Sequence, residues 1–147
     1  MDQELDLLAF KFFKLFARYE SSLKERGFFV ANRGQVTVDW DRYANEEIGN
    51  TFLAELGHAQ NAAMYILENP PKKQSANAAN EIEWVDVPNN ERCVQILFAH
   101  ICRIRNNLYH GAKFNGTWFD PERSKLLLSN ALLVLENYKD RLGIQNT

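Results

Sequence analysis

Apolar residues recur at steps of three and four along most of this chain, and that spacing is what one face of an α-helix requires. The pattern begins at residues 2–26, and Gly27 follows as a natural helix stop. Phe10 and Phe13 widen the apolar stripe beyond one face, and a helix of this kind packs on two sides. The sequence therefore places the first helix either in the core of a monomer or at a contact between subunits.

Three further helices are expected, at residues 42–68, 90–109 and 120–143. Gly49 and Gly57 interrupt the first of these, so two helical pieces with a bend are expected there. The last has the clearest start in the chain, with Asp120 as N-cap and Pro121 at the first helical position. The fold class predicted is all-α, a four-helix-bundle-like domain with a bent or split second helix.

The segments between the predicted helices lack helical periodicity. Residues 36–38 look like a short extended piece and residues 82–87 like a brief strand, and their pairing would add a small β-hairpin-like element to the bundle. Residues 72–80 are polar and carry no core-forming side chain, so we expect them to form a surface loop.

Length and composition describe a single globular domain spanning residues 1–147. A chain of 147 residues has too little apolar surface for two cores, and 46% hydrophobic with 24% charged residues excludes disorder. No apolar run approaches the ~18 residues of a membrane span. Met1 is followed by an acidic segment where a signal peptide would be basic. We therefore expect a cytoplasmic protein without membrane contact.

The histidines and cysteines do not have the spacing of a metal or redox site. The chain has three His and two Cys residues but neither a C-x-x-C pair nor an H-E-x-x-H pattern, and it has no phosphate-binding glycine loop. Cys102 and His100 are two residues apart, which on a helix points them away from each other and argues against a thiol nucleophile. We expect no metal site and no cofactor.

One segment is locally basic although the net charge of the chain is only −2. Residues 92–119 contain no Asp or Glu, and Arg105 projects from the apolar side of the third predicted helix. A guanidinium stays charged at neutral pH, so burying it without an anion costs on the order of several kcal/mol. Its partner is either a carboxylate, such as Glu47 or Glu55, or a phosphate, which fits the planar fork of arginine.

His110 stands at the end of the same helix, where the helix dipole favours a cation. Arg105 and His110 would point about 140° apart on an ideal helix. They converge on one substrate only if the last turn of the helix unwinds or if a second chain supplies the other member of the pair. A C-capping histidine without chemistry is the alternative for His110.

The run from Arg105 to His110 resembles the signature of the HEPN (higher eukaryotes and prokaryotes nucleotide-binding) superfamily. That signature is an Arg with a polar residue directly after it, here Asn106, and a His after a gap of four to six residues. The gap here is four residues, and the run continues as Gly-Ala-Lys at residues 111–113, the glycine-rich ending of many members. The likeness covers the helical frame from residue 2 to residue 143, but only residues 105–113 are specific.

The resemblance implies a metal-independent endoribonuclease of toxin–antitoxin, phage-defence or RNA-processing systems, with two protomers joining their motifs at a dimer cleft. RNA supplies its own 2′-OH nucleophile, so the enzyme needs only a proton carrier and a cation at the phosphorus. His110 would be the general acid/base, Arg105 would stabilise the pentacovalent phosphate, and Asn106 would orient the imidazole or a phosphate oxygen. The product would end in a 2′,3′-cyclic phosphate. In a toxin role, a nucleotidyltransferase-like antitoxin would be the partner protein.

Five further residues are candidates for RNA contact: Arg103, Tyr109, Lys113, Lys72 and Lys73. The basic ones would hold flanking phosphates and Tyr109 would stack on a base, although solvated charges and a packed tyrosine are the plainer alternatives. The rival function is a non-catalytic helical module of the same fold that binds a protein partner or nucleic acid. In that function Arg105 is a buried structural ion.

Overall fold

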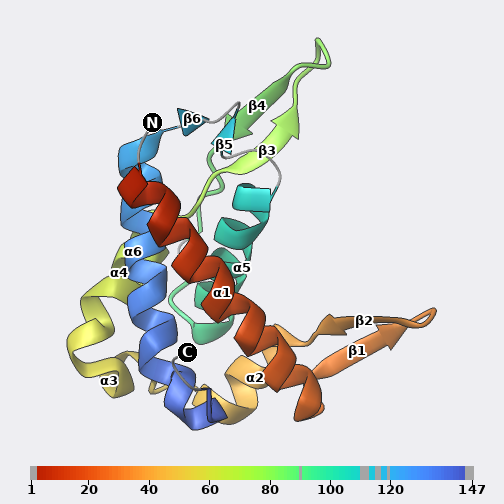
Figure 1. The fold of residues 1–147 in the computed structure, drawn as a ribbon, viewed down its shortest axis with the longest axis vertical. Helices are drawn as coiled ribbons and strands as arrows, with labels where there is room; N and C mark the ends of the chain where they lie inside the picture. Colours follow the sequence, from red (N-terminus) through yellow and green to blue (C-terminus); the bar gives the residue numbers. More distant parts are fainter. Residues whose placement is uncertain (1–2, 90, 110–112, 115–116, 119, 145–147) are drawn as a thin grey trace.

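A computed structural model of the chain describes residues 3–89, 91–109, 113–114, 117–118 and 120–144. Its longest described helix, α1 (Gln3–Glu25), lies across α5 (Val94–Tyr109) and α6 (Pro121–Tyr138) (Figure 1). Six α1 side chains at helical spacing are buried: Leu5, Phe12, Leu15, Phe16, Tyr19 and Leu23. The Tyr19 hydroxyl donates a hydrogen bond to the carbonyl of Leu135, 2.5 Å away, and so joins α1 to α6. None of the described helices is both long and apolar enough to span a membrane.

The break expected in the second helix is confirmed. The pieces are α2 (Trp40–Tyr43), the π-helical turn η1 (Ala44–Ile48), α3 (Phe52–Leu56), the 3₁₀ turn η2 (Gly57–Ala59) and α4 (Gln60–Glu68). Gly49 has a φ of 80° and Gly57 a φ of 55°. Both values lie in the left-handed region, which glycine adopts without steric cost. The two glycines are therefore the points at which the chain changes direction.

The all-α prediction is wrong, because short antiparallel hairpins occupy the connections. Strand β1 (Phe29–Asn32) pairs with β2 (Gln35–Val38), β3 (Lys73–Ala76) pairs with β4 (Ile82–Val85), and β5 (Lys113–Phe114) pairs with β6 (Thr117–Trp118). The hairpins β1–β2 and β3–β4 project from a body of helices (Figure 1). The chain is therefore a mixed helix-and-hairpin domain and not a plain four-helix bundle.

Hairpin β1–β2 is closed by a tight turn at Arg33 and Gly34. Their φ values are 52° and 80°, and two successive positive φ values are the backbone of the common two-residue hairpin turn. Residues 36–38 therefore pair with the neighbouring strand β1, and the predicted pairing with residues 82–87 is wrong. A neighbour across a two-residue turn costs less chain entropy than a strand more than forty residues away.

Strand β4 confirms the brief strand expected at residues 82–87, whereas its partner β3 lies where the sequence predicted a surface loop. The side-chain oxygen of Asn77 accepts hydrogen bonds from the backbone N–H groups of Ala79 and Glu81, both at 2.9 Å. This Asn-centred turn reverses the chain, so residues 73–76 form strand β3. A polar strand of four residues has no apolar alternation, which is why its sequence looked like a loop.

An aromatic cluster fixes the position of α5 against α1 and α2. Trp40 stacks on Phe98 with ring centroids 5.8 Å apart, and Tyr43 meets the same ring edge-on at 5.5 Å. Phe16 of α1 packs against Trp40 at 5.1 Å. Such offset and edge-to-face pairs add stability beyond their buried area. Helix α5, which carries the candidate motif, is thus packed on α2, and α2 is packed on α1.

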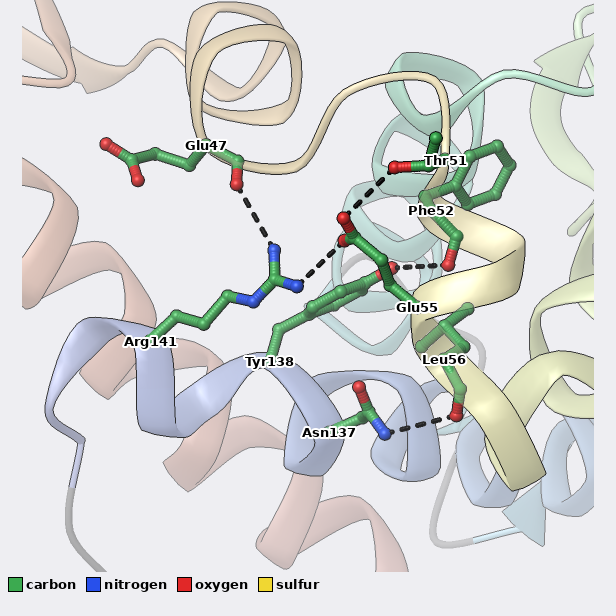
Figure 2. A network of polar contacts seen from close by, with 8 residues as sticks. All are labelled: Glu47, Thr51, Phe52, Glu55, Leu56, Asn137, Tyr138 and Arg141. Carbon is green, nitrogen blue, oxygen red and sulfur yellow. Dashed lines mark hydrogen bonds and ion pairs between the residues drawn. The ribbon is translucent and has the colours of Figure 1, made fainter.

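The turn that follows α6 is anchored to α3 and to η1 (Figure 2). In the 3₁₀ turn η3 (Lys139–Leu142), the Arg141 guanidinium binds the carboxylate of Glu55 at 2.8 Å and the carbonyl of Glu47 at 3.2 Å. The buried Tyr138 hydroxyl donates to the carbonyl of Phe52 at 3.2 Å. These contacts join the end of α6 to α3 and η1.

Candidate functional site

Arg105 lies at the edge where α5 meets α1. The α5 residues Val94, Leu97, Phe98, Ile101 and Ile104 are buried, and Arg105 borders this stripe as a half-buried residue. Its guanidinium carbon is 5.9 Å from the centre of the Phe16 ring, within the range of a cation–π interaction. Its Nη1 donates to the side-chain oxygen of Asn106 at 3.1 Å. The guanidinium plane is therefore supported by α1 and in contact with an exposed amide.

The two carboxylates considered as partners of Arg105 have another role. Glu55 forms its ion pair with Arg141 and accepts a hydrogen bond from Thr51 at 3.0 Å. Glu47 contributes its backbone carbonyl to the same Arg141. Arg141 lowers the pKa of the Glu55 carboxyl, mainly through the hydrogen bond that its guanidinium donates to this carboxylate. Both glutamates serve the anchor of η3 rather than the cation on α5.

The second half of the motif is only partly described. His110 lies outside the described residues, so the structure gives no geometry for the Arg105–His110 pair. Tyr109 is the last residue of α5 and Lys113 the first of β5, but their side chains are also outside what is described. Of the three residues assigned to catalysis, the structure brings together Arg105 and Asn106.

Arg103 is two residues before Arg105, which places the two about 160° apart around α5, and its charge acts on the buried His100. His100 is 3% exposed, and neither of its ring nitrogens has a hydrogen-bond partner among the described residues. Burial, together with the charge of Arg103, lowers the pKa of His100 to about 4. His100 is therefore neutral at physiological pH and does not serve as a proton carrier there. Arg103 belongs to this second environment on α5 and not to the Arg105 edge.

Lys72 and Lys73 differ in their relation to the motif. The backbone carbonyl of Lys72 accepts a hydrogen bond from the Asn107 side chain at 2.8 Å, which brings the start of β3 to the C-terminal half of α5. Lys73 is exposed on β3, opposite Val85. Of the lysines predicted to contact RNA, Lys72 is hydrogen-bonded through its backbone to the helix that carries Arg105.

A cavity of about 60 Å³ lies between the start of β3, α5 and α6. Arg123 of α6 donates a hydrogen bond to the carbonyl of Pro70 at 2.7 Å. The segment at residues 70–72 is therefore bound by Arg123 of α6 and by Asn107 of α5. The walls are mostly apolar, with Trp84, Ile104, Leu108 and Leu127 among them. No sequence pattern marks Asn107 or Arg123 as a functional residue. Asn107 lies inside the motif segment, but no sequence signal marked the two backbone carbonyls that these side chains bind.

The thiol next to the site is inert. Burial raises the pKa of Cys102 to about 12, with a smaller contribution in the same direction from Glu20. A thiol with that pKa is protonated at neutral pH and is not a nucleophile. Within the described part of the chain there is no group of three or more His, Cys, Asp or Glu side chains that could hold a metal ion.

Comparison of the chain with models of protein families, with curated proteins and with solved structures finds no match.

Proposed function

We propose that this protein is an endoribonuclease that works without a metal ion and cleaves RNA by attack of a 2′-OH on the adjacent phosphorus. In this proposal His110 moves the proton, Arg105 stabilises the pentacovalent phosphate, and Asn106 orients the imidazole or a phosphate oxygen. The observation that carries the proposal is the placement of Arg105 at the edge of α5. There its guanidinium contacts a ring and an amide, Phe16 and Asn106.

The surroundings of Arg105 support this role. The planar fork of a guanidinium is suited to two phosphate oxygens, and the Phe16 ring supports the guanidinium of Arg105. Asn106 is exposed, so a ligand that reaches Arg105 also reaches the amide. Cys102 is protonated at neutral pH, which agrees with a reaction whose nucleophile comes from the substrate.

The wider setting of the proposal comes from the resemblance of residues 105–113 to the HEPN signature. Two copies would form the active unit and share a cleft, in a cytoplasmic toxin or defence system with a nucleotidyltransferase-like antitoxin as the partner. Lys72 and Lys113 would hold flanking phosphates, and Tyr109 would stack on a base. Arg103 contributes only if RNA extends to the His100 side of α5.

The test is cleavage of a labelled RNA by the purified protein in EDTA. Wild type is compared with Arg105→Ala, Asn106→Ala and His110→Ala, and Arg33→Ala at the exposed turn of β1–β2 is the matched control for loss of a positive charge. We expect His110→Ala to lower the rate by about 10²–10⁴-fold, Arg105→Ala to lose comparable activity, and Arg33→Ala to match wild type. Intact RNA with wild type at high enzyme concentration would contradict the proposal.

A specific observation favours the second candidate, a non-catalytic interaction module. Several large apolar side chains are exposed on α1 and on the projecting hairpins, with Phe10 at 64% and Ile82 at 72%. Three of them, Leu7, Phe10 and Phe13, share one face of α1, and a contiguous exposed apolar face is typical of a site for a protein partner. If Arg105→Ala lowers only the stability of the fold and no RNA is cleaved, this function replaces the nuclease.

A further inference from the structure

The outer face of α1 carries three large apolar side chains that the core does not use. Leu7 is 56% exposed, Phe10 64% and Phe13 47%. At 100° per residue these three positions fall within an arc of about 120°, opposite the buried stripe. Figure 1 shows α1 lying across α5 and α6, and the exposure of the three side chains places them on its solvent side.

The size of this face is that of the centre of a protein interface. Three large side chains at about half exposure present on the order of 300 Å² of apolar surface. A standard interface takes about 800 Å² from each partner and has an apolar centre with a polar rim. The charged residues that flank Leu7, Phe10 and Phe13 on α1 would supply that rim.

The sequence of α1 is complementary to itself about Phe10. If a two-fold axis crosses the helix at Phe10, residues whose numbers add up to 20 face each other in an antiparallel pair. Phe10 then meets Phe10 of the second copy, and Leu7 meets its Phe13. Asp6 meets Lys14, so opposite charges lie at both ends of the contact. A parallel pairing would instead place Asp6 beside Asp6 and Lys14 beside Lys14.

We propose that the outer face of α1 binds the same face of a second copy of this chain in antiparallel orientation. The apolar contact supplies the affinity, and the crossed Asp6–Lys14 pairs select the antiparallel register. Both charged residues also interact within their own chain, so the crossed pairs act as rim contacts that set register.

This contact has a consequence for Arg105 that rests on the proposed function. Arg105 is supported by Phe16, six residues from Phe10 along α1 and on the side that faces α5. The two-fold axis of this pair lies in the contact plane and is perpendicular to α1. It therefore keeps the two Arg105 residues at the same edge of the interface. They are separated by about 18 Å along the helix direction, from a rise of about 1.5 Å per residue. One RNA strand could then contact both subunits.

The first test is sedimentation equilibrium of the full chain. Wild type is expected to be a dimer, and Phe10→Glu to raise its dissociation constant at least tenfold with an unchanged circular dichroism spectrum. Leu133→Glu is the matched control, because Leu133 is 50% exposed on α6, and it is expected to leave the dimer intact. Asp6→Lys and Lys14→Asp should each weaken the dimer, and the double variant should restore it.

The second test fixes the register. In a Cys93→Ser background, Phe10→Cys is expected to form a disulfide with its own copy on mild oxidation, and Leu133→Cys is not. A wild-type monomer at all concentrations would overturn the proposal and leave the face to a different protein. A dimer that is unaffected by Phe10→Glu and does not cross-link through position 10 would also overturn it.

Cleavage is measured on the same samples, so the two proposals fail separately. A dimer through Phe10 that leaves RNA intact supports the interface and refutes the nuclease. A monomer that cleaves RNA refutes the interface and the dimeric active unit, and leaves the cleavage chemistry standing.

Discussion

His100 makes the stability of this fold depend on pH in a way that one substitution should remove. The side chain is 3% exposed, and burial next to Arg103 lowers its pKa to about 4. In the unfolded chain the same imidazole titrates near its usual value of about 6.5. Between these two pH values the unfolded state binds more protons than the folded state, so acid favours unfolding.

The size of the effect follows from the difference between the two pKa values. Above pH 6.5 the imidazole is neutral in both states, and the free energy of unfolding is not reduced by this group. As the pH falls toward 4, protonation of the unfolded state lowers the free energy of unfolding progressively. The loss is about 2 kcal/mol at pH 5 and reaches a limit of about 3 kcal/mol. Below pH 4 the imidazole is charged in both states and the loss is complete.

The assay is urea unfolding of wild type and His100→Leu at several pH values from 4 to 8. Other acid-sensitive groups cancel in the difference between the two proteins. Because the ring nitrogens have no hydrogen-bond partner among the described residues, we expect the variant to match wild type at pH 7 within about 1 kcal/mol. It should become the more stable of the two as the pH falls. A difference that does not change between pH 7 and pH 4.5 would refute the reasoning.

Three shorter predictions concern the frame around the site. Tyr138→Phe should cost about 1–2 kcal/mol in urea unfolding, because it leaves the carbonyl of Phe52 without its buried donor. Gly49→Ala should cost about 1–2 kcal/mol in the same assay, since its φ of 80° is unfavourable for alanine although space for a methyl group exists. In the folded protein at pH 8, iodoacetamide should modify Cys102 only after urea is added, as measured by mass spectrometry, because burial raises the pKa of this thiol to about 12. Rapid labelling of native Cys102 would contradict the packing described.

Local signals in the sequence predicted the long helices well. Residues 2–26 were expected to be helical and α1 spans Gln3–Glu25, because its buried stripe repeats over many turns. Asp120 caps α6 as expected, and its carboxylate accepts a hydrogen bond from the backbone N–H of Arg123 at 3.4 Å. Both features depend only on residues close in sequence, so the sequence alone was enough.

The hairpins and the surroundings of Arg105 depend on contacts between distant residues. Strands of four residues show too little alternation to separate them from loops, and their pairing is decided by turns such as Arg33-Gly34. The sequence indicated that Arg105 needs a partner, but it could not show that Phe16 supports it or that Glu55 binds Arg141. Nor did it indicate that His100 is held neutral by burial.

We propose that Arg105 and His110 cleave RNA through the 2′-OH of the substrate. The most direct test of this proposal is a DNA oligonucleotide with a single ribonucleotide, incubated with the protein in EDTA and analysed by mass spectrometry. We expect one cut by wild type, directly after the ribonucleotide, that leaves a 2′,3′-cyclic phosphate and is lost in Arg105→Ala and His110→Ala. Cleavage of the all-DNA strand, or a cut that persists in both variants, would contradict it.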